Sequence, residues 1–493
     1  MLATDLEAFV VPGVEITDAL GLDLMAAGLR VASNPRHATL LVLVGEIPPG
    51  LARAAAVVYS QQPRPRAILS VGAQSPVPLP TADASVRGNQ SALGEGVAEL
   101  RRRIALGAWD PDPPAFVIEE THAQTAEMDH AQLGEMNHMH MPEMEHADMG
   151  GGGFMSMVMM THDLPRSADG LPMEWIEVPF GPLFPGLPGG LGLVLTLDGD
   201  TVVRAEVRSG TVHRDLAATW PGPAETFADR LARLDPLAST AYRILACRAL
   251  EQASGSEPDE SEVRRRIAAL ERERAASHLT WLGRFGFLLG EAWLAHRASA
   301  CARAIRTADD AQAFADVRDR IAAFLGWQRS APLLRQRLHG VGGIEPEFAH
   351  DLRGPVARAC GRAADTRHGD PAYRAVGFAP VIEEGADVYA RLSVRLAEIE
   401  QSLELIRAVG IDRSPVTPKS VPDTATGRAS VETPRGTASL VVTVAEGQVL
   451  DISLDVPSSA NVHLVRGVAV GHELADGLLG IASLDLSPWE LDK

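Results

Sequence analysis

Apolar positions near the N-terminus occur in short unbroken runs, with one amphipathic stretch between them. Residues 38–45 (ATLLVLVG) form a continuous apolar run of strand length, which is typical of a strand covered on both faces. Residues 51–62 (LARAAAVVYSQQ) predict a helix, and residues 66–73 (RAILSVGA) predict a second buried strand. Strand, helix and strand at this spacing favour a right-handed βαβ unit and a parallel sheet. A helix over residues 95–105 would complete an N-terminal α/β domain, residues 1–110.

Further along the chain, the apolar spacing becomes that of helices. Residues 191–210 first predict a β-hairpin, because two apolar runs flank the turn residues Asp198-Gly199-Asp200. Residues 260–298 carry apolar residues three and four apart with Glu/Arg pairs on the other face, and predict one long helix or two abutting ones. Residues 388–409 predict another amphipathic helix.

The C-terminal part returns to strand patterns. Residues 412–436, with four prolines and several Thr and Ser, predict a loop. Residues 438–456 predict strands, and residues 474–482 predict a short helix. Residues 166–493 are therefore predicted to form a mainly α-helical α+β domain with small sheets at its edges.

Between the two predicted domains, residues 111–165 have a biased composition. Ten of the 13 methionines and six of the 15 histidines fall between residues 122 and 162, and periodicity is weak, so the segment predicts a flexible linker. Thioether and imidazole groups at this spacing also suit copper(I) or copper(II). The densest group is Met136, His138, Met139, His140, Met141, Met144 and His146. Metal binding here and a solvated or partner-packed connector are open alternatives.

Charge and cysteine content exclude several classes of function. The formal charge is −19, from 64 acidic and 45 basic residues, so we expect no nucleic-acid partner. Cys247, Cys301 and Cys360 lie far apart, which excludes a disulfide framework and a zinc ribbon and leaves too few thiolates for a four-cysteine iron–sulfur cluster. The most apolar long segment, residues 278–296, is interrupted by two charged residues, so we expect no direct membrane insertion.

Seven segments of the second part are similar, in order, to the large subunit shared by respiratory complex I and membrane-bound [NiFe]-hydrogenases. That family opens with GPQHPSTHG, a β-hairpin and G-x-x-HRG, followed by E-L-x-R-I-x-S-H-L-x-W-L-G. The similar segments are residues 181–214 (GPLFPGLPGGLGLVLTLDGDTVVRAEVRSGTVHR), 271–283 (ERERAASHLTWLG), 335–344 (RQRLHGVGGI), 354–367 (GPVARACGRAADTR), 384–402 (EGADVYARLSVRLAEIEQS), 431–436 (VETPRG) and the tail at 457–465 and 472–493.

The N-terminal domain resembles the small iron–sulfur subunit that sits against this large subunit. Residues 35–73 are similar to its P-R-x-A-D-x-x-x-V-x-G and M-A-x-x-x-R-x-x-Y-x-Q-M-P-x-P-x-W-V-I-x-x-G segments, and residues 9–16 (FVVPGVEI) to its L-A-C-C-x-V-E-M. The chain thus resembles a fusion of both core subunits, with formate-hydrogenlyase-type complexes as the nearest branch.

The cysteines of both families are replaced here. In the small-subunit pattern, the cluster cysteines fall on Val11, Pro12 and Gln74 and near Asn89, so the resemblance implies no [4Fe–4S] cluster. In the large-subunit pattern, the nickel-binding cysteines fall on Ala232, Asp235, Ser487 and Glu490, and nickel and iron in such a site need soft sulfur ligands. We therefore expect neither an iron–sulfur nor a nickel–iron cofactor in this chain.

The quinone-site positions of the resemblance are also altered. The two histidines of GPQHPSTHG fall on Phe184 and Pro188, and the quinone-facing tyrosine falls near Arg233, which weighs against quinone reduction. His213 keeps its position after a strand where the family lines its cavity. His213 and Arg214 are therefore candidate cofactor-binding residues, with a structural role as the alternative.

Other charged residues on the predicted helices have structural interpretations. His278 is interpreted as a buried packing histidine, and Glu271 and Arg274, three apart, as a pair along the helix. Three further residues are interpreted as a structural ion-pair face of the helix over 388–409: Asp387, Arg391 and Arg395.

The resemblance implies a hydrophilic-arm subunit of a membrane-bound complex I-like or formate-hydrogenlyase-like oxidoreductase. Its expected partners are antiporter-like polytopic membrane subunits, and its expected location is cytoplasmic, attached to the inner face of the membrane through those partners. Its missing metal ligands imply a degenerate core whose own catalysis is in question. Two alternatives stay open: an active NADH/quinone-type oxidoreductase subunit with an unidentified cofactor site, and a metal-binding protein that uses the Met/His tract.

Overall fold

The computed structural model describes residues 6–106, 175–214, 220–329, 331–348 and 351–492. Its N-terminal part is built on a five-stranded parallel sheet with the strand order β2-β1-β3-β4-β5. The strands are β1 (Leu6–Val11), β2 (Leu29–Val31), β3 (Leu40–Val44), β4 (Ala67–Val71) and β5 (Ala84–Val86). All residues of β3 and β4 are buried, as their continuous apolar runs predict. The predicted βαβ unit is therefore confirmed.

Helices cover both faces of this sheet. Helix α2 (Pro49–Gln61) packs on one face, and α1 (Val14–Ala19) and α3 (Gln90–Ala105) pack on the other. Helix α3 begins five residues before the predicted start, because the Asn89 side chain caps it by accepting a hydrogen bond from the amide of Ala92.

A three-stranded antiparallel sheet opens the helical part. It consists of β6 (Ile176–Phe180), β7 (Gly192–Asp198) and β8 (Thr201–Arg208), and β7 and β8 form the predicted hairpin. Apolar side chains of β7 pack against α9 (Glu260–Leu288) and α10 (Ala292–Thr307) in the largest hydrophobic core. Of the two alternatives predicted for residues 260–298, the structure has two helices, which are separated at Gly290, where φ is +75°.

The other helices of this part surround α9. Helix α15 (Val388–Val409) lies along α9, and α18 (Leu474–Leu484) contacts both α9 and α15. The remaining elements between β8 and α15 are β9 (Gly222–Pro223), η2 (Ala224–Thr226), α7 (Phe227–Leu231), α8 (Ser239–Ser254), α11 (Ala311–Arg329), α12 (Pro332–Leu338), η3 (Pro346–Phe348), α13 (Gly354–Arg358), η4 (Thr366–Gly369) and α14 (Pro371–Ala375).

A second antiparallel sheet packs on α8, with the strand order β10-β11-β12-β9. Its long strands are β10 (Ala425–Thr433), β11 (Gly436–Ala445) and β12 (Gln448–Asp455). The chain then continues through α16 (Pro457–Asn461), α17 (Leu464–Ala469), α18 and α19 (Pro488–Leu491). The prediction of a loop over 412–436 is wrong for its second half, because β10 pairs with β11 along its whole length. Three of the four prolines precede β10, and only Pro434 lies after it, in the turn.

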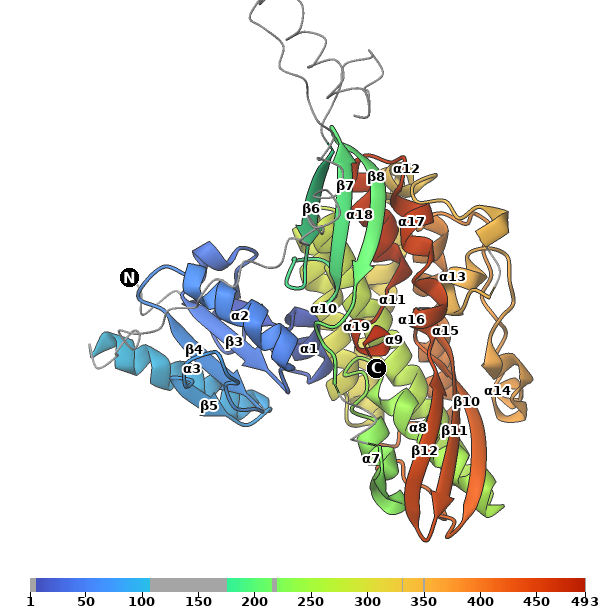
Figure 1. The fold of residues 1–493 in the computed structure, drawn as a ribbon. Coiled ribbons are helices and arrows are strands. Elements are labelled where there is room, and N and C mark those ends of the chain that lie inside the picture. The colour runs from blue at the N-terminus through green and yellow to red at the C-terminus, as the bar shows by residue number, and fades with distance from the viewer. Residues whose placement is uncertain (1–5, 107–174, 215–219, 330, 349–350, 493) are drawn as a thin grey trace, which may run out of the picture.

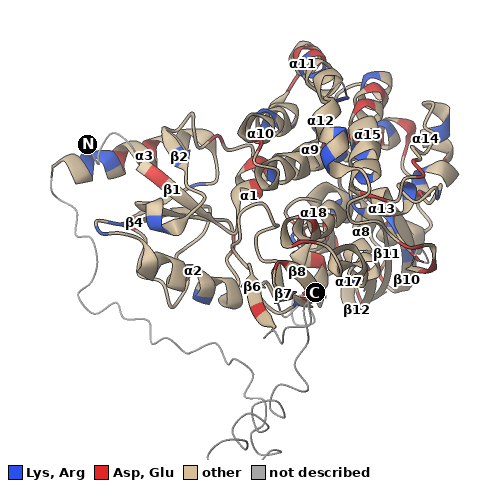
Figure 2. Ribbon diagram, turned by 90° about the horizontal axis from the view of Figure 1, so that it is seen from above, with Lys and Arg blue, Asp and Glu red and all other residues tan. Residues whose placement is uncertain are grey.

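The two parts of the chain contact each other where glycines allow close approach. A Cβ atom on Gly189, in the loop before β7, would lie 2.1 Å from the carbonyl oxygen of Pro12. A Cβ atom on Gly50, in α2, would lie 2.6 Å from the carbonyl oxygen of Thr211. Helix α1 lies between the sheet and the helices α9 and α10 (Figures 1 and 2). The segment after β1 is thereby packed against the helical part. Within the described ranges, no helix is both long and apolar enough to cross a membrane.

Candidate functional site

Two positions predicted to replace the nickel ligands, Asp235 and Glu490, lie in one buried group of polar side chains. We call this group the core ionic cluster, and it contains Asp235, Tyr242, Arg435, Asp485 and Glu490. Five segments supply these residues: the turn after α7, helix α8, the β10–β11 turn, the end of α18 and helix α19. All five residues are buried, although four of them are carboxyl or guanidinium groups that water would otherwise solvate.

Arg435 is the central cation of the core ionic cluster. Its Nη1 donates to Oδ2 of Asp235 at 2.8 Å, and its Nε donates to the backbone oxygen of Asp485 at 2.9 Å. The Asp485 carboxylate lies 3.5 Å from the same Nε. Oδ1 of Asp235 also accepts from the amide of Leu237 at 2.7 Å. The arginine therefore supplies positive charge to two buried carboxylates at once.

Glu490 lies at the other end of the core ionic cluster and is held by neutral donors. Its Oε1 accepts from the Tyr242 hydroxyl at 2.7 Å, and its Oε2 accepts from the amide of Ser458 at 3.0 Å. The amide of Ser487 donates to the Ser458 hydroxyl, while the Ser487 hydroxyl itself has no hydrogen-bond partner in the described part of the chain. The third replaced position, Ser487, is thus adjacent to the cluster, and the fourth, Ala232, contributes no polar group.

Burial and neighbouring charges shift the pKa values in this cluster in opposite directions. Burial and the charge of Asp235 raise the pKa of Glu490, and burial and Glu490 raise the pKa of Tyr242 well above its usual value. Burial by itself would raise the pKa of Asp485, but Arg435 and Arg284 hold it below its usual value. Burial opposes the charge on Arg435, yet Asp485 and Asp235 raise the pKa of this guanidinium. At neutral pH the Tyr242 hydroxyl therefore keeps its proton and remains a donor.

The donor set of the core ionic cluster does not fit a nickel–iron group. Such a group takes soft thiolate ligands, whereas these positions carry carboxylates, a hydroxyl and a methyl group. Both Asp235 oxygens and both Glu490 oxygens already accept hydrogen bonds from protein groups. No catalytic step is therefore derived through such a group.

The positions predicted to replace the cluster cysteines of the small subunit lie at the carboxyl edge of the parallel sheet. Val11 ends β1 and is buried, and Pro12 follows it against Gly189. Gln74 follows β4, and Asn89 is engaged in capping α3. None of these side chains carries sulfur, so this edge does not fit a cysteine-ligated cluster either.

One arginine connects the core ionic cluster to the α/β part. Nη2 of Arg284, on α9, donates to Oδ1 of Asp485 at 2.8 Å, and its Nη1 lies 3.8 Å from Oε1 of Glu15, on α1. The same Glu15 oxygen accepts from the amide of Gly189 at 2.6 Å. The cluster and the boundary between the two parts are thus linked by side chains of α9 and α1.

The two residues predicted to line a cavity, His213 and Arg214, are not members of the core ionic cluster, although Arg214 is close enough to Asp235 for that charge to act on its pKa. The His213 side chain is exposed, and Arg214 lies over the Trp489 ring with its guanidinium carbon 4.6 Å from the ring centroid. Nη1 of Arg214 donates to the backbone oxygen of Arg233 at 2.7 Å, and burial lowers the pKa of Arg214. A cofactor role for either residue remains a prediction. Phe184 packs edge-on against Phe180, so the quinone-histidine positions offer no polar donor.

A second buried network surrounds the middle of α9. Glu271 accepts hydrogen bonds from the Tyr373 hydroxyl, the Ser402 hydroxyl and Arg367, and it pairs with Arg274 at 3.3 Å as predicted. His278 is fully buried with Nε2 2.9 Å from Oε2 of Glu398. Burial lowers the pKa of His278 to about 4, although Glu398 raises it. His278 is therefore a neutral, packed histidine, in agreement with its sequence interpretation.

The interpretation of Asp387, Arg391 and Arg395 as an ion-pair face is wrong. Asp387 caps α15, accepting from the amides of Ala390 and Gly340. Arg391 donates to the Ser483 hydroxyl and to backbone oxygens, and Arg395 stacks over the Trp281 ring. The helical spacing correctly places Arg391 and Arg395 on one face of α15. That face is buried against α18 and α9, so the two guanidinium groups contact a hydroxyl, backbone carbonyl groups and an aromatic ring instead of carboxylates.

The predicted metal-binding group of the Met/His tract lies outside the described residues. This applies to Met136, His138, Met139, His140, Met141, Met144 and His146. Among the residues that are described, no three His, Cys, Asp or Glu side chains are grouped so that they could hold a metal ion.

Comparisons with known proteins match up to about two thirds of the chain, and the matching family model lies in the helical part. The family model for the 49 Kd subunit of respiratory-chain NADH dehydrogenase matches residues 306–427. The D subunit of the NADH-quinone oxidoreductase of Desulfotalea psychrophila is 28% identical over 365 residues, which cover 65% of this chain and 98% of that protein. The equivalent protein of Saccharopolyspora erythraea is 31% identical over 275 residues, covering 48% of this chain and 60% of that protein.

A solved structure supports the same fold. A chain from the membrane-bound sulfane sulfur reductase, an archaeal respiratory membrane complex, superposes with a TM-score of 0.58 at 23% identity and covers 66% of this chain and 100% of its own length. Over the matched residues, the helical part is thus similar to large subunits of the complex I type.

In the helical part, sequence reasoning missed several residues of the site. Arg435 lies in the quoted VETPRG segment and Tyr242 lies on α8, but neither was selected as a candidate. The missed signal was charge balance: placing Asp235 and Glu490 at buried positions requires a nearby cation and a donor.

Proposed function

We propose that this chain is a hydrophilic-arm subunit of a membrane-bound, complex I-like or formate-hydrogenlyase-like oxidoreductase, in which a small-subunit-like and a large-subunit-like part are fused. The observation that carries the proposal is the core ionic cluster. Asp235 and Glu490 occupy ligand positions of the metal site in the resemblance, yet they are neutralised or hydrogen-bonded by Arg435 and Tyr242. The large subunit would thus keep its fold and contacts without a metal centre of its own.

In this proposal the subunit acts through its contacts with other subunits. Antiporter-like polytopic membrane subunits are the proposed partners, and the chain is attached through them to the cytoplasmic face of the membrane. Buried networks around α9 and at the core ionic cluster favour a rigid scaffold, because each buried charge there has an opposite charge or a donor beside it. Electron transfer through this chain is not part of the proposal.

The test is purification of the tagged, full-length chain from membranes of its native host in a mild detergent. Mass spectrometry is expected to identify polytopic membrane subunits in stoichiometric amounts, and metal analysis is expected to find no nickel and no stoichiometric iron with acid-labile sulfide. A monomer without membrane partners would contradict the assembly proposal. Nickel, or a reducible cluster detected by electron paramagnetic resonance, would instead favour an active oxidoreductase subunit and contradict the degenerate core.

The composition of the Met/His tract favours a second function, metal handling. Thioether and imidazole groups at M-x-H and H-M-H-M spacing are ligands that copper accepts. Titration of a peptide of residues 121–162 with copper(I) and zinc(II) tests this function. Binding no tighter than about millimolar, corresponding to roughly 4 kcal/mol of binding free energy, would contradict it.

A further inference from the structure

Two tryptophans lie side by side on the surface of α10 and α11. The centroid of the Trp293 ring, on α10, is 4.4 Å from that of Trp327, on α11, and 5.9 Å from that of the buried Phe324. Both tryptophans are half exposed, at 52% and 51%, whereas Trp281, on the neighbouring helix α9, is 2% exposed. Contiguous exposed apolar side chains mark interaction surfaces more often than isolated ones do. The tryptophan pair is therefore a candidate docking surface.

Two arginines extend this pair into a larger surface. Arg297 follows Trp293 by four residues on α10, and Arg320 precedes Trp327 by seven residues on α11, so each arginine shares a helical face with its tryptophan. Both arginines are exposed, and neither has a hydrogen-bond or ion-pair partner within the described part of the chain. Both lie near Cys301, on α10, because their charges lower the pKa of its thiol, which burial raises. We call Trp293, Arg297, Arg320 and Trp327 the basic aromatic face.

The acidic side chains around the basic aromatic face do not neutralise it. Asp316 accepts a hydrogen bond from Nε2 of Gln312 at 2.8 Å, and Asp319 forms an ion pair with the preceding arginine at 2.8 Å. Glu291 lies two residues before Trp293, a spacing that does not share a helical face. A complementary occupant therefore carries carboxylates for the arginines and polarisable apolar groups for the indole rings.

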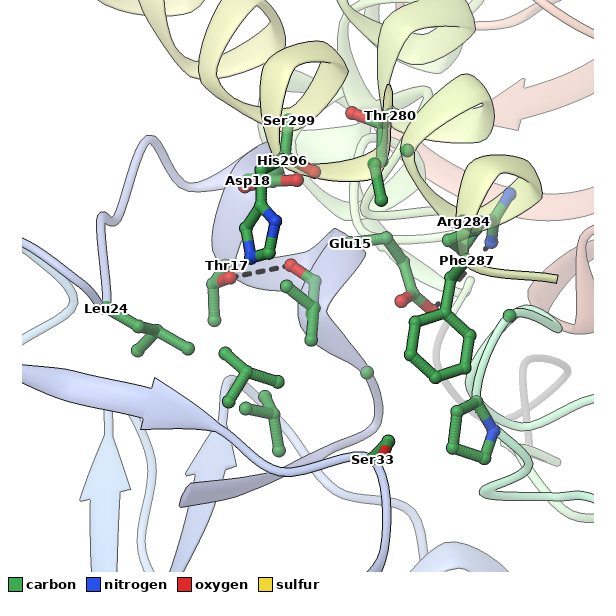
Figure 3. Close-up of a pocket in the computed structure, with 18 of the residues that line it drawn as sticks. Glu15, Thr17, Asp18, Leu24, Ser33, Thr280, Arg284, Phe287, His296 and Ser299 are labelled. Atoms are coloured by element: carbon green, nitrogen blue, oxygen red, sulfur yellow. Dashed lines mark hydrogen bonds and ion pairs between the residues drawn. The ribbon is translucent and has the colours of Figure 1, made fainter. Parts of the chain in front are cut away.

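The basic aromatic face is distinct from the large cavity beside it. Trp293 and Arg297 also border a cavity of about 730 Å³ between α1 and α10, but Arg320 and Trp327 do not. Figure 3 shows His296, on α10, directed into that cavity toward Thr17, on α1. Figure 2 shows α11 at the outer edge of the helical part. The tryptophan pair therefore lies on the side of α10 that faces α11.

Residues 121–162 of the same chain have the complementary composition. They contain ten methionines and six acidic residues, and no lysine or arginine. Thioether groups make favourable contacts with aromatic rings, and the unbranched methionine side chain adapts to irregular surfaces. The whole connection over residues 107–174 carries a formal charge of −12, from 13 acidic residues and Arg166.

The length of this connection permits the contact. Residues 107–174 lie between the end of α3 and the start of β6, and when extended they span up to roughly 220 Å at about 3.3 Å per residue. A compact chain of about 400 residues has a radius of gyration of roughly 21 Å. The connection therefore reaches any face of the described structure, and complementarity to methionine and carboxylate selects the basic aromatic face.

We propose that the basic aromatic face binds residues 121–162 of its own chain. Methionine side chains of this segment pack on the rings of Trp293 and Trp327, and its carboxylates pair with Arg297 and Arg320. The contact would hold the connection between the two parts of the chain against α10 and α11. It would also remove the exposed tryptophan pair from solvent.

The test is photo-cross-linking in the full-length chain, with p-benzoylphenylalanine in place of Ala323, which is exposed on α11 between Arg320 and Trp327. The matched control carries the same photoreactive residue in place of Leu450, which is 58% exposed on β12. Cross-links to residues 121–162, located by peptide mass spectrometry, are expected at least about fivefold more often from position 323, because docking raises the local concentration of the segment there. Equal yields from both positions, or cross-links from position 323 to other segments only, would overturn the proposal.

Isotope labelling identifies which chain supplies the bound segment. In a mixture of labelled and unlabelled chains, each cross-linked peptide pair is expected to carry one label, because the segment belongs to the same chain as the face. Pairs that combine both labels would show that a second copy occupies the face, and would overturn the proposal.

Charge reversal separates docking from the reactivity of methionine toward the probe, because it changes neither the segment nor position 323. Arg297→Glu/Arg320→Glu is expected to lower the yield about fivefold, since two attractions become repulsions. Arg428→Glu, at an exposed position on β10, is expected to leave the yield unchanged. Trp293→Ala/Trp327→Ala is expected to lower the yield as well. An unchanged yield in either double variant would contradict the proposed contact.

This test is independent of the proposed function. Absence of the cross-link would not affect the subunit composition or the metal content, and absence of membrane partners would not affect the cross-link within one chain.

Discussion

Replacing Arg435 by methionine is expected to destabilise the helical part more than replacement of any exposed arginine. Arg435 is buried and contacts two carboxylates, at 2.8 Å to Asp235 and 3.5 Å to Asp485. In Arg435→Met, the Asp235 side chain would keep, among the described residues, only the Leu237 amide as a hydrogen-bond partner while remaining fully buried. Removing one partner of a buried ion pair costs about 3–5 kcal/mol, because the other charge stays uncompensated.

The assay is denaturant unfolding of the full-length chain, followed by circular dichroism. Arg337→Met is the matched control, since Arg337 also pairs across elements, with Asp476, but both side chains are partly exposed. An exposed pair contributes at most about 1 kcal/mol to the free energy of unfolding. The double variant Arg435→Met/Asp235→Asn is expected to recover at least about half of the loss, because asparagine carries no charge to be buried.

The pH dependence gives an independent check of the same reasoning. In the wild type, Arg435 and Arg284 hold the pKa of Asp485 below its usual value against the effect of burial, so this contribution to stability is present above the usual carboxyl pKa and is lost at lower pH. In Arg435→Met, protonation removes the uncompensated charge, so the difference from the wild type is expected to shrink as the pH falls from 7 to 4. The reasoning is refuted if Arg435→Met loses no more stability than Arg337→Met, or if the double variant is no more stable than the single one.

Two further predictions concern the boundary between the parts and the buried histidine. Gly189→Ala is expected to increase protease cleavage of the α/β part, because the new Cβ atom would lie 2.1 Å from the carbonyl oxygen of Pro12. The control is Gly326→Ala, in α11 with open space around it, which is expected to be neutral or to stabilise the protein by up to about 1 kcal/mol. Equal cleavage of both variants would contradict the contact between Gly189 and Pro12. Burial lowers the pKa of His278 to about 4 from an ordinary value of 6.5. Between pH 4 and pH 6.5 the unfolded chain therefore binds more protons than the folded chain. The free energy of unfolding is expected to fall by about 1.4 kcal/mol for each pH unit below about 6.5. His278→Gln is expected to flatten that dependence, and an unchanged slope in urea unfolding at pH 5 and pH 7 would show that another group is responsible.

The fold was predictable where one periodicity dominates a segment. The runs that become β3 and β4 are apolar at nearly every position because helices cover both faces, and the helix over 388–409 has the predicted bounds. The strand β10 was missed because its alternation includes Gly427 and polar residues, and because the prolines before it suggested a loop. Its structure depends on pairing with β11 and packing on α8, which are contacts between segments far apart in the sequence.

The candidate site was predictable only in part, for a similar reason. The resemblance placed Asp235 and Glu490 at ligand positions of one metal site, and both lie in the core ionic cluster. Their partners could not be derived from spacing, because Arg435 and Tyr242 come from a strand turn and from a different helix. The sequence allowed one general prediction, that each buried carboxylate needs a cation or hydrogen-bond donors beside it. Which residue provides them depends on the fold.

The core ionic cluster explains how this fold can remain stable with several carboxylates in its interior. Carboxylates at interior positions would destabilise the core if they were unpaired, so their presence requires compensation within the same site. Arg435 compensates Asp235 and Asp485, and Arg284 extends the charge pairing from Asp485 to Glu15, in the helix that follows β1. Since Arg284 contacts both Asp485 and Glu15, a change at this side chain should affect the core of the helical part and its contact with the α/β part together. Such joint effects distinguish a connected scaffold from two independently stable parts, because independent parts would show separate unfolding transitions that shift one at a time.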